Sequence, residues 1–121
     1  MAMEPVPPPT SHSNAPGRGP RAATAVASGG ATAARYIAKD SDGAIDVTLI
    51  DDSEMFTTCF FSNLYVGGYR SFESITHSYD TLQSSYGITK VTGRASSVDR
   101  AAKTVTMADG SSIPYDRLVV S

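Results

Sequence analysis

The sequence contains a single cysteine, Cys59, and no tryptophan among its 121 residues. One cysteine cannot form a disulfide within the chain, and it cannot supply the several thiolates of a structural zinc site. Dithiol redox chemistry within the chain is excluded for the same reason. Any chemistry that the Cys59 thiol performs is therefore performed by that thiol alone.

Excess charge of one sign and long apolar runs are also lacking. The formal net charge is -2, from 10 basic and 12 acidic residues, which gives no electrostatic footprint for nucleic acid. No apolar run approaches the roughly 18 residues of a membrane span. The first residues lack the charged and apolar regions of a secretory signal, so the chain as written would stay in the cytoplasm. We expect a small-molecule ligand, no nucleic acid and no membrane span.

Proline is concentrated at the start of the chain and is nearly absent from the rest. Residues 1–23 hold six of the seven prolines, together with Ser, Asn and Gly and few large apolar side chains. Such a segment cannot bury enough apolar surface to offset the entropy of ordering it. We predict that residues 1–23 are disordered and that residues 24–121 form one domain.

The pattern after this segment indicates an α/β fold. Residues 25–40 suggest a turn followed by a helix that ends around Ser41 to Gly43. Residues 45–51 form a β-branched run that is short enough for a buried strand. A strand, a helix and a strand in this order predict a βαβ unit with parallel strands.

Residues 71–86 place apolar side chains three and four positions apart, which predicts a second amphipathic helix ending at Gly87. The residues after Gly87 alternate apolar and polar side chains on short strands, with Asp109-Gly110 as a hairpin turn. The predicted architecture is a partial Rossmann-like domain, built from a βαβ unit and an inserted antiparallel hairpin.

Dinucleotide binding through a βαβ unit uses three glycines in the first turn, so that the backbone can approach the pyrophosphate. The matching positions are Ala25, Ala27 and Gly30, so only the third glycine is retained, with Gly29 beside it. Asp51 follows Gly30 by 21 positions, close to the spacing of about 20 at which a ribose-binding carboxylate is expected. Two alternatives stay open: an ordinary βαβ turn of small residues, and a solvated carboxylate at a strand end.

Five segments, in their order and spacing, resemble the flavin subunit of flavocytochrome c sulfide dehydrogenase. That subunit is related to the flavoprotein reductases with two dinucleotide-binding domains, which include sulfide:quinone oxidoreductase. The most specific segment is the thiol loop TCFFSN, which is followed by Gly67-Gly68. The matching segments are GGATAARYI, VTLID, TTCFFSNLYVGG, SITHSYD and ADGSSIPYDRLVVS.

The resemblance implies a cofactor, FAD, and a role for each matching residue. Cys59 would carry the FAD through a thioether to its 8α-methyl group, and Asp51 would bind the adenosine ribose. Gly29 and Gly30 would be what remains of the pyrophosphate turn. The resemblance further implies sulfide as the substrate, a cytochrome c subunit as the partner and the periplasm as the location. The alternative for Cys59 is a small buried apolar residue, the usual place of a free cysteine.

The family also has a second dinucleotide-binding domain, a redox-active cysteine pair and a carboxyl-terminal region, none of which this sequence contains. We therefore expect an amino-terminal fragment that lacks the groups that take the sulfide. The alternatives are a truncated or frameshifted, non-catalytic product without cofactor, and a quinone-linked or NADH-linked relative. A shifted reading frame near residues 24–30 would account for the altered glycine turn.

The remaining candidates have simpler expected roles. His77 is expected to face solvent or to cap the second helix, rather than to act as a base. No metal site is expected, because His12 has no ligand partners near it. Four tyrosines could stack on a flavin: Tyr36, Tyr65, Tyr69 and Tyr79. The helical spacing of Tyr36 and Tyr79 favours packing for these two.

Overall fold

The computed structural model describes residues 21–25 and 28–121, with side chains from residue 29 onward. Residues 1–20, most of the segment for which we expected disorder, lie outside the described residues, as does Ala27. The first strand begins at Arg21, ahead of the expected start of the domain at residue 24. The elements in chain order are β1 Arg21–Ala25, α1 Ser28–Asp40, β2 Asp46–Asp51, β3 Met55–Thr57, α2 Ser62–Val66, the 3-10 helix η1 Glu73–Ile75, β4 Thr76–Ser78, α3 Asp80–Tyr86, β5 Thr89–Thr92, β6 Ala95–Asp99, β7 Thr104–Met107, β8 Ser112–Pro114 and β9 Arg117–Val120.

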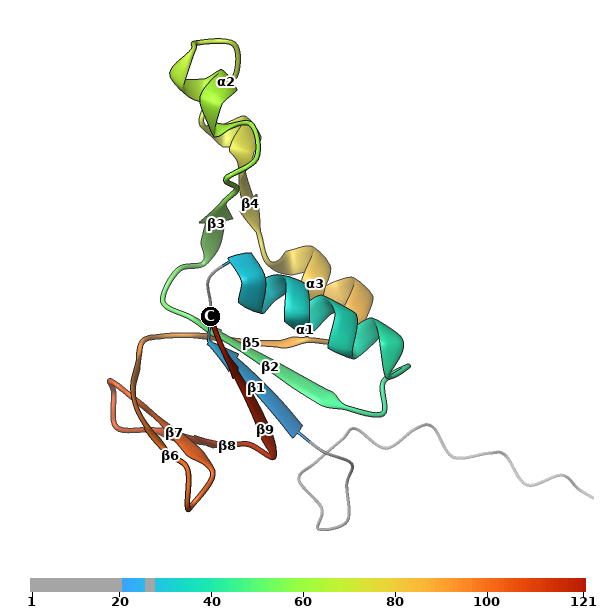
Figure 1. The fold of residues 1–121 in the computed structure, drawn as a ribbon, viewed down its shortest axis with the longest axis vertical. Helices are drawn as coiled ribbons and strands as arrows, with labels where there is room; N and C mark the ends of the chain where they lie inside the picture. The colour runs from blue at the N-terminus through green and yellow to red at the C-terminus, as the bar shows by residue number, and fades with distance from the viewer. Residues whose placement is uncertain (1–20, 26–27) are drawn as a thin grey trace, which may run out of the picture.

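A parallel sheet with the strand order β5-β2-β1-β9 forms the centre of the molecule (Figure 1). Strand β2 pairs with β1 and β5, and β1 pairs with β9 on its other side, all in parallel. Parallel neighbours need a crossover connection, and α1 supplies it between β1 and β2. The predicted βαβ unit and the α/β fold class are therefore confirmed.

Strand β2 is central because its side chains are apolar on both faces of the sheet. Val47 and Leu49 are 3% and 0% exposed and point to one face, whereas Ile50 is 2% exposed and points to the other. Alternate residues of a strand face opposite sides. Two separate apolar clusters thus form, one on each face, and both fix the position of β2.

The first cluster lies under the helices α1 and α3, which cover the same face of the sheet (Figure 1). Ala34 and Ala38 are four positions apart on α1, and both are buried against β2. Their small side chains let the helix backbone approach the sheet closely. Tyr79 and Ile88, on either side of α3, complete the cluster. Helix α3 ends at Gly87, as expected, in the left-handed conformation with φ of 65°.

The second cluster lies between the parallel sheet and an antiparallel sheet of order β6-β7-β8. Val105 and Met107 of β7 pack against Ile50. The turn between β7 and β8 contains Asp109 and Gly110, as predicted, and Gly110 has φ of 87°. The molecule thus has three layers: two helices, a parallel sheet and an antiparallel sheet.

Residues 55–78 form an arm that projects beyond the three layers (Figure 1). Its base is the antiparallel hairpin β3-β4, and its tip contains α2 and η1. The predicted helix over residues 71–86 is therefore wrong for its first half, since only Asp80–Tyr86 is α-helical. Residues 76–78 pair instead with β3, because the β-branched Thr57 and Thr76 suit a strand pair.

None of the described helices is long and apolar enough to cross a membrane.

The burial of Leu49 gives a direct test of this architecture. Replacing Leu49 by alanine should lower the free energy of unfolding by about 3 kcal/mol, because it leaves a cavity between the sheet and the helices. Val66 is 84% exposed at the tip of the arm, and its replacement by alanine should change the same quantity by less than about 0.5 kcal/mol. Urea denaturation followed by circular dichroism measures both, and equal effects would contradict the fold.

Candidate functional site

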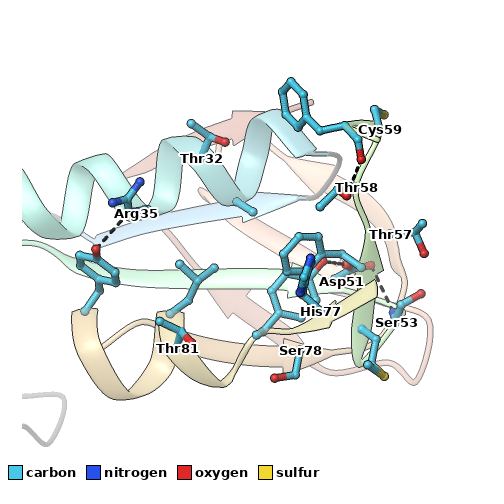
Figure 2. Close-up of a pocket in the computed structure, with 17 residues that line it drawn as sticks. Thr32, Arg35, Asp51, Ser53, Thr57, Thr58, Cys59, His77, Ser78 and Thr81 are labelled. Atoms are coloured by element: carbon cyan, nitrogen blue, oxygen red, sulfur yellow. Dashed lines mark hydrogen bonds between the residues drawn. The ribbon is translucent and has the colours of Figure 1, made fainter. Parts of the chain in front are cut away.

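A groove of about 870 Å³ opens beside the carboxyl end of β2 (Figure 2). Helix α1 forms one side of it, α3 and β4 form the other, and the start of the arm closes one end. Asp51 and Cys59, which lie on different elements, both line this groove. The structure therefore places the expected ribose ligand and the expected flavin ligand in one continuous site.

Asp51 is the last residue of β2, and the chain holds its carboxylate through both oxygens. The backbone N–H of Ser53 donates to Oδ1 at 3.2 Å, and the hydroxyl of Tyr79 donates to Oδ2. A carboxylate has about four lone-pair positions, so two remain for a ligand. Asp51 is half-buried and is thus not the freely solvated carboxylate of the alternative interpretation.

Tyr79 is the residue that couples Asp51 to the core. Its side chain is 2% exposed, and its ring centroid lies 5.1 Å from that of Phe56. Burial of the ring, and then the hydrogen bond to Asp51, raise the pKa of the Tyr79 phenol far above its ordinary value. The phenol consequently remains a proton donor to Asp51 throughout the neutral range. The expectation that Tyr79 packs, rather than stacking on a ligand, agrees with this burial.

Lys90 brings a positive charge to the same end of β2. Its ammonium donates to the backbone carbonyl of Asp51 at 3.0 Å and to Oγ1 of Thr92 at 3.2 Å. The ammonium also lies 5.1 Å from the ring centroid of Tyr79, a distance at which a cation is attracted to an aromatic face. Burial lowers the pKa of Lys90, although the charge of Asp51 opposes this effect.

Cys59 is exposed, which contradicts the alternative of a buried apolar cysteine. It lies at the start of the arm, in a segment that hydrogen bonds hold in place. The Thr58 backbone N–H donates to the carbonyl of Ile75 at 2.9 Å, and the Thr58 hydroxyl donates to the same carbonyl at 3.2 Å. The hydroxyl of Ser62 donates to the carbonyl of Cys59 itself at 2.8 Å. The backbone of the thiol loop is thereby fixed on both sides of Cys59.

Gly29 and Gly30 lie in the first turn of α1, beside the end of β9. A β-carbon added at Gly29 would lie 3.7 Å from Cβ of Ser121, which is ordinary van der Waals contact. Here the strand order changes side, since β2 and β5 lie on one side of β1 and β9 on the other. Ligands of open α/β sheets bind at such a switch point, outside the carboxyl ends of the strands. Ala25 is the last residue of β1.

Several residues of the site have contacts or positions that the sequence did not predict. Tyr79 lies 28 positions from Asp51, and no sequence motif links a tyrosine to a carboxylate over that distance. His77 lines the groove from strand β4, where its ring lies 5.7 Å from that of Phe56, and does not sit on the predicted helix. At the far end of the groove, Nε of Arg35 donates to the Tyr86 hydroxyl at 3.1 Å (Figure 2).

Within the described residues, no cluster of three or more His, Cys, Asp or Glu side chains could hold a metal ion.

Comparison with solved structures identifies the fold. No protein-family model matches the sequence. The sulfide:quinone oxidoreductase from Aquifex aeolicus superposes with a TM-score of 0.72 and 30% identity, over 84% of this chain and 24% of that one. The NAD-dependent persulfide reductase from A. fulgidus gives 0.72 and 20% identity, over 83% of this chain and 21% of that one. Putidaredoxin reductase, in its covalent complex with putidaredoxin, superposes with a TM-score of 0.71 and 18% identity. The match covers 86% of this chain and 26% of that one.

These likenesses show that the chain has the Rossmann-like FAD/NAD-binding fold of flavin-dependent and nicotinamide-dependent oxidoreductases. The chain spans about a quarter of the length of the structures that it matches. The three-layer arrangement is therefore that of the FAD/NAD-binding domain of these proteins.

The bond between Tyr79 and Asp51 predicts a pH dependence of stability. Because the pKa of Tyr79 is raised above 10.0 in the folded state, the bond stabilises the fold fully below that pH and is lost as the pH rises through the folded pKa. Wild type should exceed Tyr79→Phe in unfolding free energy by about 1.5 to 3 kcal/mol at pH 7, and by less above about pH 11. Urea denaturation at both pH values measures this, and a difference that grows with pH would contradict it.

Proposed function

We propose that this chain is the FAD-binding portion of a sulfide-oxidising flavoprotein of the flavocytochrome c type. The observation that carries the proposal is the presence of Asp51 and Cys59 in one groove of a FAD/NAD-binding fold. These residues suit the two ends of one FAD molecule. The carboxylate suits the ribose at the adenosine end, and the thiol suits the isoalloxazine end.

The adenosine end of the groove fits a ribose because its acceptor is already oriented. Asp51 keeps two lone-pair positions after Ser53 and Tyr79 have donated to it. A ribose presents two neighbouring hydroxyl groups, which are hydrogen-bond donors that match these positions. The negative charge of the carboxylate would also disfavour a phosphate on the ribose, because like charges repel.

The pyrophosphate end of the fit depends on the start of α1. The backbone N–H groups of a helix amino terminus favour phosphate groups, and Gly29 is exposed in the first turn of α1. Gly30, next along α1, is buried. The alanine at position 25 replaces a family glycine, so the pyrophosphate would be held by fewer close contacts. We infer that the thiol compensates for this by holding the cofactor covalently.

Cys59 is suited to covalent attachment because its thiol is exposed while its backbone is fixed. A bond from its Sγ to the 8α-carbon of FAD would replace one S–H and one methyl C–H bond. The two electrons and two protons released would pass to dissolved oxygen. Once attached, the flavin supplies reversible two-electron chemistry at the groove.

The remaining parts of the proposal concern the substrate, the partner and the location. The A. fulgidus protein acts on persulfide and the Aquifex aeolicus protein on sulfide, according to their names, and this supports a sulfur substrate here. A cytochrome c subunit as acceptor, and the periplasm as location, are proposed from the likeness of the thiol loop to flavocytochrome c sulfide dehydrogenase.

A second candidate is a quinone-linked sulfide oxidoreductase. It is favoured by the 30% identity to the sulfide:quinone oxidoreductase from Aquifex aeolicus over 84% of this chain. The thiol of Cys59 separates the two candidates in this chain, because a relative that binds FAD without a covalent bond does not need a cysteine at that position.

The thioether can be tested by mass. The chain incubated with FAD in air should gain the mass of one FAD, less two hydrogens, and give a yellow pellet after acid precipitation. Cys59→Ser should gain nothing, and neither should wild type incubated with 8-demethyl-FAD, which lacks the reacting carbon. A colourless wild-type chain of unchanged mass would favour the non-catalytic or the quinone-linked alternative.

The role of Asp51 can be tested with ADP, which carries the same ribose as FAD. Replacing Asp51 by asparagine should weaken ADP binding about tenfold, because it removes a charged hydrogen-bond acceptor. Asp52→Asn is the matched control, since Asp52 is the neighbouring carboxylate and does not line the groove. Isothermal titration calorimetry gives both dissociation constants. Equal losses in the two variants would remove Asp51 from the site.

A further inference from the structure

Tyr79 does more in this structure than fill the core, because its hydroxyl reaches the carboxylate of Asp51. The ring is 2% exposed and belongs to the cluster that includes Val47, Leu49 and Ile88. A buried phenol needs a hydrogen-bond partner, and for Tyr79 that partner is a residue of the groove. The core of the domain is thereby connected to one polar group of the site.

The position of Tyr79 in the chain makes this connection rigid. Tyr79 follows β4 directly and precedes α3, for which it is the N-terminal cap residue. The centroid of its ring lies 5.1 Å from that of Phe56 of β3 and 5.1 Å from the Lys90 ammonium. The hydroxyl is therefore held at a fixed place relative to β2, whose own register is set by β1 and β5.

A competing donor lies close to Asp51. The Lys90 ammonium already contacts the backbone carbonyl of Asp51 at 3.0 Å. A carboxylate released by Tyr79 would be attracted to that ammonium, because opposite charges at short distance attract strongly. The charges of Glu54 and Asp52 also act on Lys90 and, like that of Asp51, raise its pKa against the effect of burial. In the structure, the Tyr79 hydroxyl rather than the Lys90 ammonium donates to Oδ2 of Asp51.

We propose that Tyr79 is a positioning residue that orients Asp51 for the paired hydroxyl groups of an adenosine ribose. The inference rests on the proposed function, since it assumes a ribose in the groove. Tyr79 does not touch the ribose itself. Its hydroxyl occupies one lone pair of Oδ2, so that the remaining lone pairs of the carboxylate are presented to both ribose hydroxyls together.

The test compares ADP with 2′-deoxy-ADP, because only the first offers both hydroxyl groups. Wild type should bind ADP more tightly than 2′-deoxy-ADP, and Tyr79→Phe should reduce this preference by about threefold or more. A role of Tyr79 in packing alone would weaken both nucleotides equally and leave the preference unchanged. Tyr115→Phe is the matched control, since Tyr115 packs against the other apolar cluster, and it should keep the wild-type preference.

The possible outcomes separate this inference from the proposed function. Failure of the wild-type chain to bind ADP overturns the ribose site and this inference together, whereas the thioether to FAD is tested separately by mass. A wild-type preference for ADP that Tyr79→Phe retains overturns only the positioning role. If Tyr79→Phe does not fold, proton NMR of the wild-type chain replaces the binding comparison. The Tyr79 hydroxyl proton should then appear downfield and exchange slowly, both with and without ADP. Loss of that resonance in the ADP complex overturns the inference, because the bond to Asp51 would then be broken on binding.

Discussion

The burial of β2 on both faces is the constraint on which the rest of the structure depends. Val47 and Leu49 are covered by the helices, and Ile50 is covered by the antiparallel sheet. Burying each such side chain contributes about 1.5 to 3 kcal/mol, and a slip of one residue would exchange the two faces. The register of β2 is thus strongly determined. Asp51 follows Ile50 directly, so the same burial fixes the place of the carboxylate.

The two ends of the groove are held in different ways. Asp51 is attached to the three-layer body through its strand and through the buried Tyr79. Cys59 belongs to the arm, which is joined to the body through the two short strands β3 and β4. The bonds from Thr58 to the Ile75 carbonyl lie within the arm itself. The carboxylate end is therefore held by contacts with the body, and the thiol end by contacts within the arm.

The sequence predicted the elements whose signals are local. The short apolar run of β2, the helix within residues 25–40 and the turn at Asp109-Gly110 each follow from neighbouring residues, and the structure contains all three. The helix expected over residues 71–86 failed because its spacing of apolar residues is shared by a 3-10 turn, a short strand and a shorter helix. The pairing of Thr57 with Thr76 that decides between these is a long-range contact.

The candidate site was predicted in the same uneven way. The spacing from Gly30 to Asp51 and the thiol loop around Cys59 are visible in the chain, so both residues could be named in advance. The contacts of Tyr79 and Lys90 with Asp51 could not, because they join residues 28 and 39 positions apart. Their geometry exists only after β2, α3 and β5 have packed together.

The outer strand β9 has a consequence for how the parallel sheet can be extended. Within the described part of the molecule, β9 pairs only with β1, so one of its edges carries unpaired backbone groups. After Arg117 it consists of Leu118, Val119 and Val120, the last of them 70% exposed, without a charge, a proline or a bulge. Edges of this kind add further strands readily. Among the described strands, the edge of β9 that faces away from β1 is thus an edge at which a further strand would join the parallel sheet.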